Sequence, residues 1–204
     1  MNLADSLINS PRSAGDQLQK NSGICFDSVE ITELVLGVAL FHGFSKMLIA
    51  LGREPDEMET TIIQTPTAPN IPLKKSFKTS NPMYEILSPA PKLRDRWLDL
   101  EETLLNNTSY PIEKLEAARS RISELLPIPH SYAKYYTTSV IEPGSARLAD
   151  QFFYDVRSFT VEQRNQIINR YGLSGLVDLM ICLALYDGAF RIMSILTYRE
   201  KESE

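Results

Sequence analysis

Two apolar stretches of this sequence each carry a pair of side chains suited to acid–base chemistry or anion binding. His42 and Lys46 lie four residues apart in "ITELVLGVALFHGFSKMLIAL", residues 31–51. Asp187 and Arg191 have the same spacing in "LVDLMICLALYDGAFRIMSIL", residues 176–196. Residues four apart lie on one face of a helix. Because an imidazole titrates near neutral pH, His42 can act as a general acid or base, and Lys46 can hold an anionic ligand.

The candidate site includes neighbours of these pairs. The candidate catalytic residues are His42, Glu30, Glu33 and Lys46, and the candidate binding residues are Asp187, Arg191 and Tyr186. Glu30 and Glu33 also have a simpler explanation, because negative charge is favoured in the first turns of any helix. Asp27, three residues before Glu30, can form a capping box with it.

Each pair has a structural alternative as well. His42 is either an acid–base group or a core or interface histidine bonded to a carboxylate or a carbonyl. Lys46 either pairs with an acid from another part of the chain, binds an anionic ligand, or extends its ammonium group to water. Asp187 and Arg191 make an ordinary helix ion pair, but burying it on an apolar helix is costly unless it is fully bonded. That cost indicates a subunit interface or the rim of a pocket.

The two stretches match each other at a constant offset of 145 residues without a gap. In this register Gly43 meets Gly188, and Lys46 meets Arg191. Matched glycines and bases are harder to obtain by chance than matched apolar residues, so the pattern indicates an internal duplication. Because glycine inside a helix is unfavourable, the repeated glycine predicts a close approach of the two helices beside His42.

These residues require helices to position them, and the remaining patterns predict an all-α protein. Buried central helices are expected near 29–52 and 175–198. Shorter helices are expected at 89–106, 111–126, 145–159 and 161–171, where apolar residues recur at helical spacing. A proline-rich connection is expected near 62–85, and a loop is expected around 126–144. Residues 1–22 are expected to form a short helix or a flexible arm before a single helical domain, 23–204.

Composition excludes several classes of protein. The net charge of −5 and the absence of a basic block argue against nucleic acid and against an anionic membrane surface. Charged residues within both apolar stretches favour core helices over membrane spans. With two histidines and no CxxC motif, no metal or other cofactor is expected. The expected location is cytoplasmic, with Cys25 and Cys182 as reduced thiols, although a bridge between them stays open.

Two segments carry a resemblance to a known family. "FDSVEITELVLGVALFHGFSKMLIALGREPDE" and "LADQFFYDVRSFTVEQRNQIINRYG" resemble parts of the carboxymuconolactone decarboxylase and alkylhydroperoxidase D-like superfamily. The resemblance implies a helical bundle of two similar halves and a homo-oligomer. Redox-active members carry a glutamate, a CxxC motif and a histidine. Here residues 42–45 read His-Gly-Phe-Ser, so this chain looks like a member without that motif.

Three functions remain open. The first is a decarboxylase-like lyase that uses acid–base chemistry on a small carboxylated or lactone-type metabolite. The second is an oligomeric helical binding module without turnover. The third is an alkylhydroperoxidase-type oxidoreductase, which the missing CxxC disfavours because the thiolate is the nucleophile in such enzymes. The sequence does not decide whether the protein is an enzyme.

Overall fold

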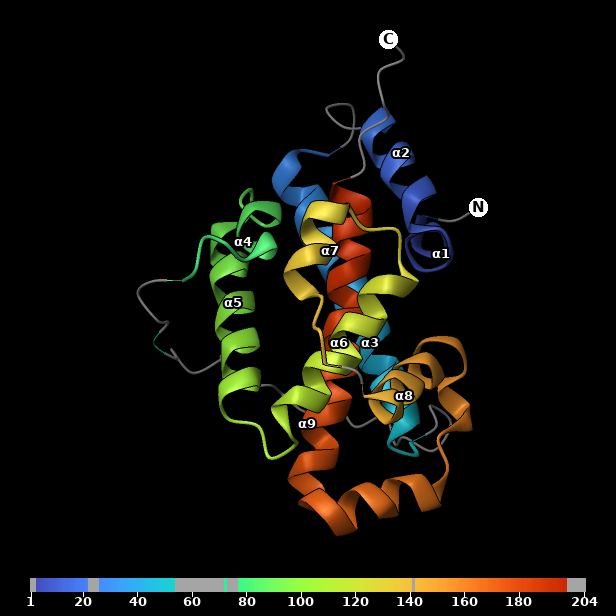
Figure 1. The fold of residues 1–204 in the computed structure, drawn as a ribbon. Helices are drawn as coiled ribbons and strands as arrows, with labels where there is room; N and C mark the ends of the chain where they lie inside the picture. The colour runs from blue at the N-terminus through green and yellow to red at the C-terminus, as the bar shows by residue number, and fades with distance from the viewer. Residues whose placement is uncertain (1–2, 22–25, 54–71, 73–76, 141, 198–204) are drawn as a thin grey trace.

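The computed structural model describes residues 3–21, 26–53, 72, 77–140 and 142–197. Its regular elements are helices, which confirms the all-α class (Figure 1). In chain order they are α1 Leu3–Asn9, α2 Pro11–Asn21, α3 Ser28–Ala50, α4 Pro82–Ile86, α5 Pro91–Asn106, α6 Ile112–Leu125, α7 His130–Tyr136, α8 Pro143–Tyr154, the short 3₁₀ helix η2 Val156–Ser158, and α9 Val161–Leu196.

Helix α9 lies at the centre of the bundle. Its start is fixed by a capping box, in which the Thr160 hydroxyl accepts from the backbone N–H of Gln163 and the Gln163 side chain accepts from that of Thr160. Two helices were predicted here, at 161–171 and 175–198. The structure confirms the break between them: the backbone of Gly172 is non-helical, with a φ of 75° that favours glycine, and α9 is two helices that meet at this kink. Beyond the bend, α9 is almost entirely buried.

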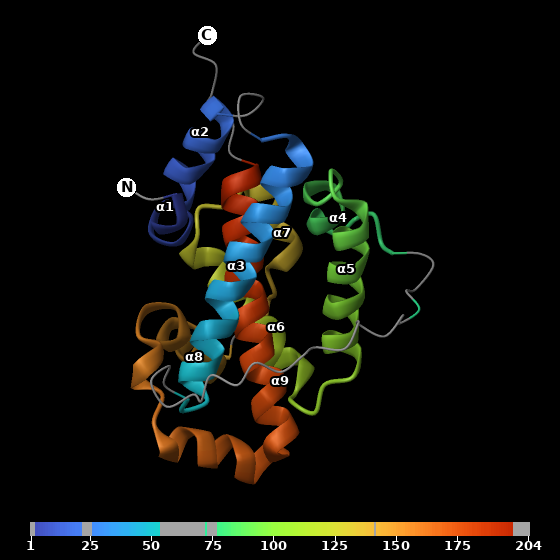
Figure 2. The ribbon, with the colours of Figure 1, turned by 180° about the vertical axis from the view of Figure 1, so that it is seen from behind.

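Helix α3 packs antiparallel against the buried part of α9 (Figures 1 and 2). The predicted capping box is present: Asp27 Oδ1 accepts from the backbone N–H of Glu30, and Glu30 Oε2 accepts from that of Asp27. The helix is buried on one side only, and its opposite side carries Phe41 with 78% of its surface exposed. This differs from the expectation of a helix buried all round, because the packing helices lie on one side of it.

The two central helices approach closely at the matched glycines. A Cβ atom added to Gly43 would collide with the backbone of Ala184, and one added to Gly188 would lie 3.2 Å from the carbonyl oxygen of Ala39. In the register of the internal repeat, Ala39 corresponds to Ala184 and Gly43 to Gly188. The two contacts therefore pair corresponding residues of the two stretches. The predicted close approach beside His42 is confirmed.

The other helices cover the central pair unevenly. Helices α1 and α2 pack against α9, and α6 packs against both α8 and α9. Helices α4 and α5 contact each other on the far side from α8 (Figure 1). Within the first 22 residues, Leu7, Ala14 and Leu18 are buried against the rest of the protein. The segment expected to be a short helix or an arm thus holds two packed helices.

Two helices lie where irregular chain was expected. Asn81 caps α4, and Pro82 stands at its first position, so this proline starts a helix inside the predicted 62–85 connection. Much of that connection lies outside the described residues. Helix α7 occupies part of the predicted 126–144 loop, because fully buried Tyr136 ties it to the core.

Helices α3 and α9 are each long and apolar enough to cross a membrane by length and composition alone. Within the protein, 89% of the apolar window of α9 is buried, compared with 33% of the window of α3. The core therefore accounts for the composition of α9, whereas the apolar outer side of α3 is left without such an explanation.

Candidate functional sites on two sides of the central helix

The structure brings His42, Lys46, Asp187 and Arg191 together between α3 and α9; we call these four residues the charge cluster. Asp187 is completely buried, and its Oδ2 accepts from Lys46 Nζ at 3.3 Å while its Oδ1 accepts from Arg191 Nη2 at 3.2 Å. His42 Nε2 lies 3.4 Å from Asp187 Oδ2. Lys46, for which the sequence offered no nearby acid, thus has Asp187 as its partner.

Groups outside the cluster complete its bonding. Lys46 Nζ also donates to the carbonyl oxygen of Phe153 at 3.2 Å and lies 4.8 Å from the centre of the Phe152 ring. Arg191 Nη1 donates to the carbonyl oxygen of Ile8 in α1. Burying charges is costly unless they are paired, and here Lys46 and Arg191 are both paired with Asp187. Arg191 Nε and His42 Nε2 are buried without a hydrogen-bond partner in the described part of the chain. The cluster therefore joins α1, α3, α8 and α9.

The titration of the cluster reflects this balance. Burial alone would raise the pKa of Asp187, but His42, Arg191 and Lys46 outweigh burial and hold that pKa below its ordinary range. Burial lowers the pKa of Lys46; the attraction of Asp187 opposes this effect and Arg191 adds to it. Asp187 is therefore a stable anion whose charge is already used by three neighbours.

The remaining sequence candidates lie apart from this cluster. Glu30 is exposed and serves as the capping partner of Asp27, and Glu33 is exposed on the same first turns of α3. Tyr186 is fully buried and donates to Glu101 Oε1 at 2.8 Å, in a different part of the core. The structure therefore brings four of the seven candidates together and leaves three apart. Tyr186 and Asp187, neighbours on α9, face different helices, and Glu30 and Glu33 lie at the start of α3.

A second polar cluster surrounds Glu101, and we call Glu101, Asn81, Arg119, Tyr136 and Tyr186 the Glu101 site. Glu101 in α5 is 4% exposed, and its Oε2 accepts from Asn81 Nδ2 at 2.6 Å. Tyr136 in α7 donates to Asn81 Oδ1 at 3.3 Å. The site therefore assembles side chains from α5, α7 and α9 and from the residue that caps α4.

Arg119 in α6 completes the Glu101 site. Its guanidinium lies 5.4 Å from the ring centre of Tyr186 and 5.5 Å from that of Tyr136. Nη1 is 3.5 Å from Tyr186 Oη, and the buried Nε has no hydrogen-bond partner in the described part of the chain. Burial alone would lower the pKa of Arg119, but Tyr186 and Glu101 raise it above its ordinary value. Arg119 is a charged donor that is not fully used.

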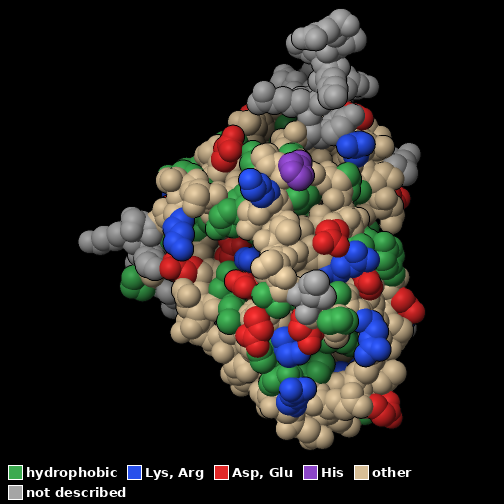
Figure 3. Space-filling view, viewed as in Figure 1, with side chains coloured by type: hydrophobic (Ala, Val, Ile, Leu, Met, Phe, Trp, Pro, Cys, Tyr) green, Lys and Arg blue, Asp and Glu red, His purple; other side chains and the backbone are tan. Residues whose placement is uncertain are grey.

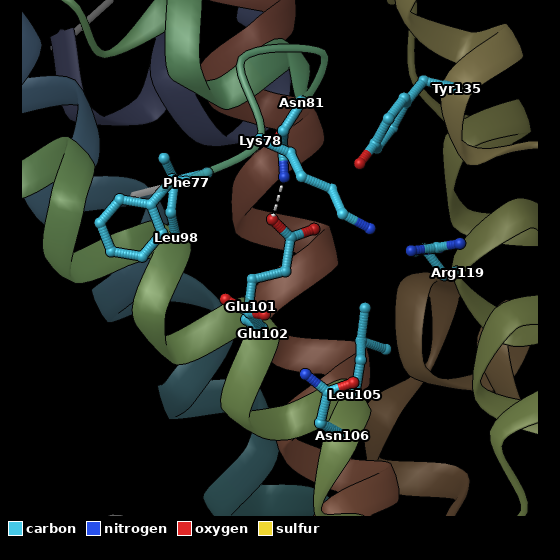
Figure 4. A pocket seen from close by; sticks show the side chains of 10 residues that line it. All are labelled: Phe77, Lys78, Asn81, Leu98, Glu101, Glu102, Leu105, Asn106, Arg119 and Tyr135. Atoms are coloured by element: carbon cyan, nitrogen blue, oxygen red, sulfur yellow. Dashed lines mark hydrogen bonds between the residues drawn. The ribbon is translucent and has the colours of Figure 1, made fainter. Parts of the chain in front are cut away.

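The Glu101 site opens into a cavity of about 170 Å³. Its lining includes Glu101, Arg119, Asn81, Lys78 and Tyr135. In Figure 4 the polar ends of these side chains point toward a common space between α5 and α7. Figure 3 shows the same face hollowed, with acidic and basic side chains together in the hollow. Both signs of charge are thus available to a ligand in one small space.

Sequence reasoning missed Glu101 and Arg119. Both sit on helices rich in charged residues, where nothing local distinguishes them from neighbours that face water. Tyr186 was a candidate, but its partner lies 85 positions away in the chain. The only local signal was burial: Glu101 falls four residues after Trp97 and three before Leu104, on the apolar stripe of α5.

The described residues give little support to thiol chemistry or to a metal site. Burial raises the pKa of Cys182 to about 12, and its thiol donates to the carbonyl oxygen of Leu115, so a reactive thiolate is disfavoured there. Cys25, and with it the question of a bridge to Cys182, lies outside the described residues. Among the residues that the structure describes, no three His, Cys, Asp or Glu side chains gather as metal ligands would.

Comparison of the chain with protein-family models, with curated proteins and with solved structures found no match in any of the three. The resemblance to the decarboxylase superfamily is neither supported nor opposed by these comparisons.

Proposed function

We propose that the protein is a small-molecule enzyme that performs acid–base chemistry in the cavity of the Glu101 site. The observation that carries the proposal is a buried carboxylate, Glu101, across a small cavity from Arg119, a buried cation with an unused donor. A carboxylate and a cation on opposite walls can divide the work of proton transfer. Glu101 takes the proton, and Arg119 holds the negative charge that develops on the substrate.

The substrate class follows from the size and charge of the cavity. A volume of about 170 Å³ is below the ~300 Å³ at which pockets for drug-sized ligands begin. Arg119 and Lys78 both offer cationic donors, and Arg guanidinium groups bind carboxylates with two parallel hydrogen bonds. These features favour a small carboxylated metabolite, one of the two substrate classes expected for a decarboxylase-like lyase.

The proposed step moves one proton. Each Glu101 oxygen accepts one hydrogen bond, from Asn81 or from Tyr186, and therefore retains a lone pair. One oxygen takes a proton from the substrate carbon next to its carbonyl or carboxyl group. The electron pair of that C–H bond passes to the substrate oxygen, where Arg119 stabilises the negative charge. Burial raises the pKa of Tyr186 well above its ordinary value, so its hydroxyl stays protonated and orients Glu101.

The test is deuterium exchange from heavy water into a panel of small mono- and dicarboxylates, followed by NMR. The wild-type protein should accelerate exchange at the carbon beside the carboxyl group, and Glu101→Gln should reduce the rate by about 10²- to 10⁴-fold. Arg119→Gln should weaken binding of the same acids. Glu113→Gln, an exposed residue of α6 outside the cavity, is the matched control and should leave both properties unchanged. Exchange that survives Glu101→Gln would exclude Glu101 as the base.

The second candidate function is an oligomeric binding module without turnover. It is favoured by the charge cluster, in which His42 and Lys46 are occupied by Asp187 and so resemble a structural clamp more than a catalytic centre. Under this alternative the cavity binds small carboxylates, but no variant changes the rate of exchange above the uncatalysed background.

A further inference from the structure

The outer side of α3 is apolar, yet no described helix covers it (Figure 2). A helix that is apolar all round is normally buried all round. The residues of α3 that are buried in the protein are Thr32, Val35, Leu36, Ala39, Gly43, Lys46 and Ala50. On the opposite side lies a stripe of exposed and half-buried residues at helical spacing, which we call the outer face of α3: Leu34, Gly37, Phe41, Ser45 and Leu48.

The outer face has an exposed ring beside a position that carries no side chain. Phe41 projects with 78% of its surface exposed, more than any other large apolar residue among those described. One turn earlier, a Cβ atom added to Gly37 would have no atom within 4 Å, so the surface there is empty. The Phe41 ring could fill the space above Gly37, which we call the notch, but it cannot do so within its own helix. It can do so when a second copy of the helix is laid antiparallel across the first.

We propose that the outer face of α3 binds the outer face of α3 in a second copy of this chain, forming a two-fold symmetric dimer. Phe41 of each copy lies over Gly37 of the other. A two-fold interface uses the same patch on both subunits, so a self-complementary patch is what such an interface requires. Gly43 of α3 already makes a close antiparallel contact of this kind, with Ala184 of α9.

The charges at the two ends of α3 favour the antiparallel arrangement. Asp27 and Glu30 are exposed at the start of the helix, and Arg53 is exposed just after its end. In an antiparallel pair, Arg53 of each copy lies near the acidic start of the other, whereas a parallel pair would bring the acids together. The acidic start also disfavours a lipid surface as the occupant, because interfacial helices use basic residues to bind anionic lipids.

The test measures the mass of the full chain by sedimentation across a wide range of concentration. The wild-type protein should be a dimer. Phe41→Glu should weaken the dimer by at least about tenfold, because it places a charge in the contact. Leu173→Glu is the matched control: it introduces the same charge at another exposed apolar residue, a leucine of α9 that is 64% exposed, and should leave the dimer intact.

Gly37→Leu separates the interface from folding. The position is open in the single chain, and leucine is a better helix former than glycine, so the folded monomer should lose no stability. The added side chain fills the notch, and the dimer should weaken by about tenfold or more. Circular dichroism and urea unfolding check that each variant is folded.

Several results would overturn the proposal. One is a wild-type chain that is monomeric at every concentration. Another is a dimer that survives both Phe41→Glu and Gly37→Leu. A third is a monomer that floats with vesicles of phosphatidylcholine and phosphatidylglycerol through Phe41, which would assign the outer face of α3 to a lipid surface.

Discussion

Tyr186 and Asp187 are neighbours on α9, yet they belong to two polar clusters whose carboxylates have different surroundings. Asp187 is surrounded by His42, Lys46 and Arg191. Lys46 and Arg191 also donate to backbone carbonyls. Tyr186 belongs to the Glu101 site, where a buried donor of Arg119 is unused and a cavity adjoins the carboxylate. A buried guanidinium donor without a partner occurs in both clusters, at Arg191 Nε and at Arg119 Nε, so the difference lies in the carboxylate. The charge of Asp187 is balanced by its neighbours, whereas Glu101 lines a cavity that can receive a ligand.

The largest expected effect comes from removing the carboxylate of the charge cluster. Asp187→Ala would leave Lys46 and Arg191 as buried cations without their common partner, and should lower the free energy of unfolding by about 3–5 kcal/mol. Asp150→Ala is the matched control, because it breaks a surface ion pair. In that pair Arg121 Nε lies 2.7 Å from Asp150 Oδ1. That control should cost less than about 1 kcal/mol. If the two variants lost the same free energy of unfolding, the buried charge cluster would stabilise the fold no more than a surface ion pair does.

A smaller loss of stability is expected at the Glu101 site. Tyr186→Phe removes the hydroxyl that donates to Glu101 at 2.8 Å, and should cost about 1–3 kcal/mol in urea unfolding. It should also reduce binding of small carboxylates, because the Tyr186 hydroxyl contacts both Glu101 and Arg119 and helps to position them. Tyr154→Phe changes a tyrosine that is 70% exposed and should alter neither quantity. A loss of stability with unchanged ligand binding would separate Tyr186 from the cavity.

The acid stability of the fold should depend on Asp187. Its pKa is lower in the folded state than in the unfolded chain, so the unfolded chain takes up the proton first as the pH falls. The stabilisation is fully present above a pH of about 4 and declines below it. Asp187→Asn should therefore show a shallower fall of unfolding free energy between neutral and acidic pH. An unchanged slope would mean that other carboxyl groups account for acid unfolding.

The smallest effect is expected at Glu33. The Glu33→Gln variant alters an exposed side chain at the start of α3, far along the helix from the charge cluster. Its unfolding free energy should stay within about 0.5 kcal/mol of the wild type, and proton exchange should be unchanged. A large loss of exchange would instead restore the acidic start of α3 as part of the active site.

The central helices and their partners in the charge cluster were predictable from the sequence because their signals are local. Apolar runs, capping residues and four-residue spacing identified α3, the buried part of α9 and the pair of Asp187 with Arg191. The Glu101 site depends on contacts between distant segments, such as Tyr186 with Glu101, which no periodicity records. Helix α7 was hidden by flanking prolines, and the exposure of Phe41 depends on which neighbours α3 has.

The bond from Arg191 to the carbonyl of Ile8 has a practical consequence for anyone who handles this protein. The buried guanidinium of Arg191 donates to a carbonyl oxygen of helix α1. Trimming the chain after Asn9, as is often done to remove a leading segment, would therefore take an acceptor from the interior rather than a loose end from the surface.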